Sequence, residues 1–267
     1  MRTRTVLFLI VSALALATCL TACRGRNHQP PEEITLQDAQ RRTTERLGWV
    51  LDDLDADAQQ RTALTALAEA LVAEGYPLRD LRKPTREAMV RELLSGNPDA
   101  KVVHGTVDGV AGPLKAFARS ATTSALKAHG ILNAEQREEL AEEWQDRADD
   151  RRSIRDREWI LDAGLERGLN RIDATEAQFK LAFQLKDSLL TDVEGLEKMR
   201  DEATAVFIAQ MRSTKPDATK VQATVDRGAV ALERFAHKAA DAAVELSQTL
   251  TKDQRVAILA AMEERRR

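Results

Sequence analysis

A repeat of 118 residues constrains the fold of this chain more than any other feature of its sequence. When residues 45–147 are aligned without a gap on residues 163–265, 27 of the 103 positions are identical. The identities include Pro, Asp and Gln positions, which a shared helical composition does not explain. Because one register holds throughout, we interpret the chain as a duplication, with one copy in residues 36–147 and the other in residues 148–267.

The residues within each copy favour helices. The chain has only 7 prolines and 12 glycines in 267 residues, and 31% of its residues are charged. In the first copy, apolar residues at helical spacing predict one helix that ends near Leu54, a second over 64–72, a short third over 89–94 and a longer fourth from Asp99. Pro113 is expected to weaken or kink the fourth helix. The sequence therefore predicts an all-α fold.

The junction between the two copies is predicted to be a long helix. From Asn133 to about Arg171 the sequence contains no proline and only late glycines, and it is dense in Glu, Arg and Asp. Roughly 36 helical residues would extend about 54 Å. The alternative is a break near Asp149 and Asp150.

The N-terminal segment has the pattern of an export signal. Two arginines precede a largely apolar run, 6–17, which is too short to span a bilayer comfortably. The sequence Leu-Thr-Ala-Cys that ends at Cys23 follows, and it resembles the bacterial lipobox, in which small residues precede a lipidated cysteine. We therefore expect residues 1–22 to be removed and Cys23 to carry lipid. The polar, proline-containing residues 23–35 are expected to form a tether.

Four sites share a pattern that is typical of helix starts. Each has an N-cap residue followed three positions later by glutamine: Asp57 and Gln60, Asn133 and Gln136, Thr175 and Gln178, and Thr251 and Gln254. In such a capping box the first side chain accepts a backbone N–H, and the glutamine bonds back to the cap. A cap contributes about 1 kcal/mol. The pattern predicts four helix starts, two in each copy.

Two of these sites extend to the longer motif Leu-Thr-x-x-Gln. Its residues are Leu250, Thr251 and Gln254 in one site, and Leu132, Asn133 and Gln136 in the other, with Asn in place of Thr. The motif, twice in each copy, resembles the Spy/CpxP family of periplasmic proteins. The upstream sites around Gln60 and Gln178 fit more loosely, because Ala replaces the Leu. The resemblance covers about 36–147 and 154–265.

The resemblance implies both an architecture and a set of functions. Members are small helical proteins that pair into a curved, cradle-shaped dimer. Some are ATP-independent chaperones, some restrain an envelope-stress sensor kinase, and some relatives sense or resist heavy metals. Applied to this chain, the resemblance implies that the two fused copies form an intramolecular pseudo-dimer. We therefore expect a monomer with internal pseudo-twofold symmetry.

The sequence offers no recognisable catalytic or metal site. Outside the leader and tether it has no cysteine and three histidines, His104, His129 and His237, none of which is shared by the two copies. No His-x3-His or Cys-x2-Cys spacing occurs. We therefore expect no enzyme activity, no cofactor and no transition-metal site, while metal binding by carboxylates alone stays open.

Two further sets of residues stand out. Asp108 and Asp226 recur in both copies and are interpreted as polar positions beside an apolar face, paired with the recurring Arg82 or Arg200. The three tryptophans are not duplicated. They either pack in the core or at the junction of the copies, or line a surface for client proteins: Trp49, Trp144 and Trp159.

The leading expectation is an envelope lipoprotein that binds unfolded or partner proteins as an ATP-independent chaperone or stress adaptor. Arg24 follows the cysteine, and inner-membrane retention is associated with Asp there, so we expect an outer-membrane anchor that faces the periplasm. A net charge of −3 gives no reason to expect nucleic acid. The alternatives are a heavy-metal sensor or resistance protein of the periplasm and a purely structural helical lipoprotein.

Overall fold

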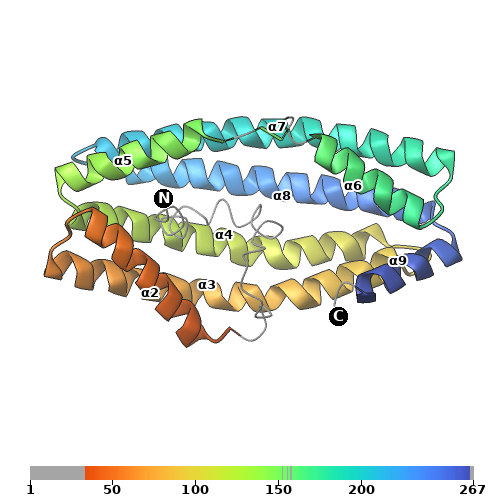
Figure 1. The fold of residues 1–267 in the computed structure, drawn as a ribbon, viewed down its shortest axis with the longest axis horizontal. Helices are drawn as coiled ribbons and strands as arrows, with labels where there is room; N and C mark the ends of the chain where they lie inside the picture. The colour runs from red at the N-terminus through yellow and green to blue at the C-terminus, as the bar shows by residue number, and fades with distance from the viewer. Residues whose placement is uncertain (1–33, 152, 155, 157, 265–267) are drawn as a thin grey trace. The chain divides into compact units, whose positions relative to one another are not determined.

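The computed structural model describes residues 34–264 except 152, 155 and 157, and it does not describe the side chain of 263. Over these residues the chain forms eight α-helices and no strand, which confirms the predicted all-α class (Figure 1). The expected signal peptide in 1–22, the lipidated Cys23 and nearly all of the tether lie outside the described residues.

The described chain has four long helices and four shorter ones, in the order short, long, long, short, which then repeats. In chain order they are α2 (Leu36–Asp53), α3 (Ala58–Leu93), α4 (Ala100–Ile131), α5 (Ala134–Asp149), α6 (Glu158–Arg171), α7 (Glu176–Arg212), α8 (Ala218–Gln248) and α9 (Lys252–Glu264). The starts of α3, α4 and α5 are each followed, 118 residues later, by the start of α7, α8 and α9. Helix boundaries therefore follow the period of the sequence repeat.

The second and third helices expected in the first copy are one helix, α3, so that expectation is wrong. Pro77 and Pro84 lie inside α3, and each costs a helix interior about 3 kcal/mol. Both prolines are exposed, whereas Leu71 before them and Met89 after them pack in the core. Packing on both sides outweighs the lost backbone hydrogen bonds, as it also does for Pro113, which lies inside α4.

The single long helix expected at the junction of the copies is also wrong. Helix α5 ends at Asp149, and α6 begins only at Glu158. Between them, the backbone N–H of Ile154 donates to Oε1 of Glu197 at 2.9 Å, and the hydroxyl of Ser153 donates to Oε2 at 3.1 Å. The carboxylate of Glu197, on α7, thus takes a backbone donor that a continuous helix would have bonded internally.

The chain divides into two compact units. The described part of unit 1 contains residues 34–82, 111–150 and 200–230, and that of unit 2 contains 83–110, 151–199 and 231–264. Each unit therefore combines segments from both copies of the sequence repeat. The sequence repeat and the packing of the helices therefore divide the chain in two different ways.

Unit 1 has a core that draws on all of its helices. Six of its buried members are Leu51 of α2, Leu64 of α3, Leu132 at the end of α4, Leu140 of α5, Ile208 of α7 and Val221 of α8. Trp144 of α5 packs edge-on against Phe207 of α7, with ring centroids 6.3 Å apart. These contacts join α5 of the first copy to α7 and α8 of the second.

Unit 2 has a smaller core where the end of α3, the start of α4 and the end of α8 meet. Val103 is fully buried and packs with Ala240 and Val244, while Met89 and Leu93 cover them from α3. The small residues Ala100 and Ala240 let helix backbones approach closely, so few side chains fill this core.

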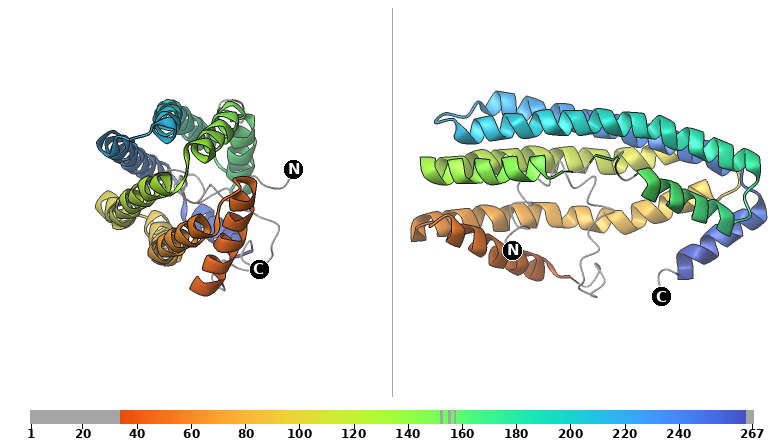
Figure 2. Two further views of the ribbon diagram at one scale, coloured as in Figure 1. Left: turned by 90° about the vertical axis from the view of Figure 1, so that its left-hand side faces the viewer. Right: turned by 45° about the horizontal axis from the view of Figure 1, so that its top comes forward.

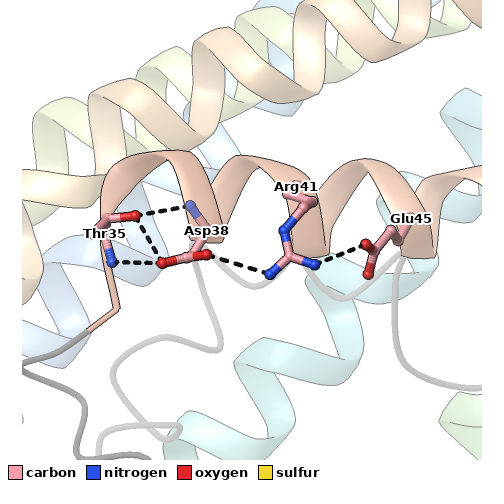
Figure 3. Close-up of polar contacts among 4 residues, drawn as sticks. All are labelled: Thr35, Asp38, Arg41 and Glu45. Carbon is pink, nitrogen blue, oxygen red and sulfur yellow. Dashed lines mark hydrogen bonds and ion pairs between the residues drawn. The ribbon is translucent and has the colours of Figure 1, made fainter.

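The described chain begins in a tight capping box at the start of α2. The backbone N–H of Asp38 donates to the hydroxyl of Thr35 at 3.1 Å, and that hydroxyl donates to the carboxylate of Asp38 at 2.8 Å (Figure 3). Arg41 binds the same carboxylate at 3.3 Å. These bonds, first that of Thr35, lower the pKa of Asp38. The hydroxyl of Tyr76 donates to the carbonyl of Ile34 at 2.7 Å. The sequence placed Ile34 and Thr35 in the tether, but in the structure they are bonded to the folded part of the chain.

Two aspartates carry the sharp turns that precede α3 and α7. Asp55 and Asp173 have φ values of 48° and 50°, in the left-handed region. A β-branched side chain is strained there, whereas glycine is not. We expect Asp55→Val and Asp173→Val each to lower the free energy of unfolding by about 1–2 kcal/mol, measured by denaturant titration.

The matched controls are Asp55→Gly, which keeps the turn unstrained, and Asp53→Val, which lies in helical backbone two residues earlier. Neither should cost as much as Asp55→Val. Equal losses for Asp53→Val and Asp55→Val would show that the turn conformation is not the cause.

Candidate functional site

The sequence-predicted caps all lie at helix starts. In each of the four sites the backbone N–H of the glutamine donates to the side chain of the cap residue. In return, the backbone N–H of the cap residue donates to Oε1 of the glutamine. The first bond measures 2.8 Å at Asp57, 2.9 Å at Asn133, 3.3 Å at Thr175 and 3.3 Å at Thr251. The returning bond measures 3.0, 3.0, 2.8 and 2.9 Å in the same order.

The same glutamines also pair with one another, which the sequence pattern did not predict. In unit 1, Nε2 of Gln60 donates to Oε1 of Gln136 at 2.8 Å, and Nε2 of Gln136 donates to Oε1 of Gln60 at 3.0 Å. In unit 2, Gln178 and Gln254 make the equivalent two bonds at 2.9 and 3.0 Å. Two capping boxes that lie 76 residues apart in the chain are therefore joined through their side chains.

Each amide in the unit 1 pair uses its full bonding capacity. The second N–H of Gln60 donates to the carbonyl of Ile131 at 3.0 Å, and that of Gln136 donates to the carbonyl of Leu54 at 3.0 Å. Each Oε1 accepts one N–H from its own cap and one from the partner glutamine. Such saturation is characteristic of a structural network, since no donor or acceptor is left for a ligand.

Replacing one amide of this pair by a carboxylate tests its structural role. Gln60→Glu removes two donors and places a charge beside the carbonyl of Ile131 and Oε1 of Gln136. We expect a loss of about 3 kcal/mol in the free energy of unfolding at neutral pH, because buried acceptors then face a carboxylate. Protonation restores one donor, so the loss should shrink as the pH falls.

The control is Gln59→Glu, at the neighbouring exposed position. It makes the same chemical change outside the network and should alter stability by less than about 0.5 kcal/mol. If the two variants unfold alike, the amide pair does not hold the helix starts together.

An ammonium group fixes α6 on α7 in unit 2. Nζ of Lys186, on α7, lies 3.0 Å from Glu158 and 2.6 Å from Asp162, both on α6, and 3.0 Å from Asp187. The hydrogen bond to Asp162, with those to the other carboxylates, raises the pKa of Lys186 above its ordinary value despite its burial. Figure 2 shows α6 lying along the N-terminal part of α7. The face of α6 that carries Glu158 and Asp162 is thereby turned inward.

The remaining faces of the first turn of α6 expose three consecutive apolar side chains. The exposed fractions of Trp159, Ile160 and Leu161 are 70%, 47% and 40%. A run of this kind is unfavourable on a helix surface unless it serves binding. The equivalent residues of the first copy are Arg41, Arg42 and Thr43, so this apolar run is a property of unit 2 and not of the repeat.

Unit 2 has a second apolar feature between α3 and α9. An open groove of about 420 Å³ is lined by Val90 of α3, by Leu94 immediately after that helix and by Leu259 of α9, together with the charged residues Glu87 and Arg91. Among the described residues, nine large apolar side chains are exposed, and six belong to unit 2: Val102, Trp159, Ile160, Leu161, Val256 and Leu259. We call Trp159, Ile160 and Leu161 the α6 patch and the residues of the open groove the α3–α9 groove.

The three tryptophans have three different environments. Trp144 is buried in the core of unit 1, as one expectation had it. Trp159 belongs to the α6 patch, and Trp49 is exposed alone on α2 in unit 1. Tertiary packing alone separates these roles, because their sequence contexts do not.

The expected partners of the recurring aspartates were wrong. Asp226 pairs with Arg119 of α4 at 2.9 Å, and Asp108 pairs with Nε2 of His237 at 3.0 Å. The hydrogen bond from Arg119 lowers the pKa of Asp226, and in turn raises that of Arg119. Arg119 and His237 are 118 residues apart, so both contacts join equivalent positions of α4 and α8. Sequence reasoning placed the partner on the helix of Arg82 or Arg200, because those arginines recur.

Two of the histidines meet in unit 2. Nδ1 of His104 lies 2.6 Å from Nδ1 of His237, although the residues are 133 positions apart in the chain. Nε2 of His104 lies 2.7 Å from Asp241. No local spacing in the sequence predicts this cluster. Only knowledge that α4 packs against α8 could have predicted it. His129, in contrast, is buried in unit 1 and contacts the carbonyl of Ser213 through Nε2 at 2.9 Å.

Comparisons with family models, curated proteins and solved structures find no match. The geometry of the residues therefore carries the functional argument. In the part of the chain that the structure describes, no helix combines the length and the apolar character that crossing a bilayer requires.

Proposed function

We propose that this protein is an envelope lipoprotein that binds unfolded or partner proteins without ATP, as a chaperone or stress adaptor. The α6 patch carries the proposal, because three adjacent apolar side chains on a helix surface have no use in a solitary folded chain. The resemblance of the Leu-Thr-x-x-Gln sites to those of the Spy/CpxP family supports the same conclusion. No catalytic step is part of the proposal.

The chemistry of unit 2 fits client segments that expose apolar side chains. Trp159 offers the largest single apolar surface of the patch, and aromatic side chains dominate binding energy at protein surfaces. The α3–α9 groove has room for a side chain, and the charged side chains of Glu87 and Arg91 in its lining limit how much apolar surface stays exposed without a client. Weak contacts of this kind bind many sequences and release them without an energy source.

The first copy offers a way to remove the α6 patch without disturbing the helix. Trp159→Arg with Ile160→Arg installs the side chains that Arg41 and Arg42 place at the equivalent positions of α2. Both changed residues are exposed, so stability should change by less than about 0.5 kcal/mol for each. We expect wild-type protein to slow aggregation of a chemically unfolded client without ATP, measured by light scattering, and the double variant to lose most of that effect.

The matched control is Trp49→Arg, which removes an exposed tryptophan from α2 in unit 1. It should suppress aggregation as well as wild type does. Equal suppression by wild type and the double variant, or none by wild type, would contradict the proposal. Equal losses in the control and the double variant would show that any exposed tryptophan serves, and that the α6 patch is not a site.

We also propose that the two copies act as the halves of one pseudo-twofold body within a single chain. Three observations support it: the helix starts that recur after 118 residues, the glutamine pair present in each unit, and the equivalent contacts of Asp226 with Arg119 and of Asp108 with His237. Each of these contacts between α4 and α8 joins the first copy to the second. Because the copies are linked, their effective concentration favours pairing within the chain over pairing between chains.

The membrane anchor is proposed from the sequence before Cys23. We expect Cys23→Ser to leave the signal segment uncleaved or to release the protein from membranes, because only a thiol accepts the lipid. Membrane fractionation with gel mobility checks this outcome. Normal processing and membrane association of Cys23→Ser would exclude Cys23 as the lipidation site and, with it, the outer-membrane assignment.

A further inference from the structure

A cluster of imidazole and carboxylate groups lies between α4 and α8 in unit 2. His104 and Asp108 are one turn apart on α4, while Glu233, His237 and Asp241 occupy successive turns of α8. The two Nδ1 atoms are 2.6 Å apart. One ligand atom from each of Asp108, Glu233 and His237 lies within 4.8 Å of the other two. Two helices thus bring one imidazole and two carboxylates to one place, and the imidazole of His104 meets that of His237 on the opposite side of its ring.

The orientation of the two imidazoles suits a metal ion. Two ring nitrogens at 2.6 Å share at most one proton, so one Nδ1 directs a lone pair at the other. On the far side of each ring, Nε2 faces a carboxylate, Asp241 for His104 and Asp108 for His237. When Nδ1–H of His237 donates to Nδ1 of His104, the lone pair of Nε2 of His237 points toward Asp108. Metal-binding histidines are commonly held in this manner, with the second ring nitrogen donating to a partner that fixes the tautomer.

We propose that this cluster binds one divalent first-row transition-metal ion, such as Zn²⁺, through Nε2 of His237 and the carboxylates of Asp108 and Glu233, while His104 orients the ring of His237. The donors are nitrogen and oxygen without thiolate, a set that suits Zn²⁺, Ni²⁺ or Co²⁺ better than Mg²⁺ or Ca²⁺. Nε2 of His237 and the carboxylate of Asp108 lie 3.0 Å apart and need only a small separation to hold an ion at about 2.0–2.2 Å from each. The side chains of His237 and Asp108 are 29% and 62% exposed, so both have room for that movement.

The equivalent positions of the sequence repeat in unit 1 carry different side chains. There Gln222 stands for His104 and Arg119 for His237, and both bond to Asp226, at 3.2 and 2.9 Å. A guanidinium has no lone pair for a metal, so this contact is an ion pair only. The chain therefore contains its own counterpart of the site without the histidines, which shows how to remove the imidazoles while keeping the contact between α4 and α8.

The test uses the full chain without a polyhistidine tag and measures Zn²⁺ binding by calorimetric titration. The variants are His237→Arg, which retains a cation beside Asp108, and His104→Gln. We expect one ion to bind each wild-type chain and the affinity to fall at least tenfold in either variant. Saturating Zn²⁺ should raise the melting temperature of wild type by about 4–8 °C and leave that of the variants nearly unchanged.

Two controls keep the result specific. His28→Gln removes the histidine that lies outside the described residues and should bind Zn²⁺ as wild type does. Circular dichroism checks the fold of each variant, and His104→Gln serves if His237→Arg is poorly folded. With Co²⁺ in place of Zn²⁺, the visible absorption of wild type should show nitrogen ligands and that of His237→Arg should not.

The proposal is wrong if wild type binds no Zn²⁺, or if wild type and both variants bind it with equal affinity. Loss of binding in His28→Gln alone would place the ion on the N-terminal segment and would also overturn it. The titration contains no client protein, so its outcome is independent of the proposed chaperone function.

Discussion

The packing of each unit depends on one polar interaction, the reciprocal pair of glutamine amides at its helix starts. In unit 1 the pair joins the start of α3 to the start of α5 and bonds the carbonyls of Leu54 and Ile131, which end the preceding helices. In unit 2 the pair of Gln178 and Gln254 does the same for α7 and α9. Because every donor and acceptor of these amides is used, the position of one helix start fixes that of the other.

The contacts between α4 and α8 show how a repeated geometry can carry different chemistry. Asp226 with Arg119 in unit 1 and Asp108 with His237 in unit 2 occupy equivalent positions, yet one is an ion pair and the other belongs to a cluster of metal-ligand type. A second histidine at 104, where unit 1 has Gln222, makes the difference. In a chain with such a sequence repeat, function is therefore best sought where equivalent residues differ, because the shared ones maintain the fold.

The same comparison explains the apolar surface. Lys186 forms ion pairs with the carboxylates of Glu158 and Asp162, and these contacts orient α6 so that the face carrying both residues is directed toward α7. Its equivalent in the first copy is Ala68, and the residues equivalent to Trp159 and Ile160 are arginines. The ion cluster around Lys186 and the apolar patch thus occur together on α6, whereas the equivalent positions of α2 carry no apolar patch, and we therefore place the proposed function in unit 2.

The sequence by itself determined the helical class, the period of 118 residues and the four helix starts, because capping and apolar spacing are local properties that neighbouring residues carry. It did not determine that α3 continues through Pro77 and Pro84, nor that the chain breaks after Asp149, since core packing and the carboxylate of Glu197 decide these points from a distance. Only the tertiary structure paired Gln60 with Gln136 and brought His104 to His237. Such contacts join residues 76 and 133 positions apart, and no local pattern encodes which turns of two distant helices will face each other.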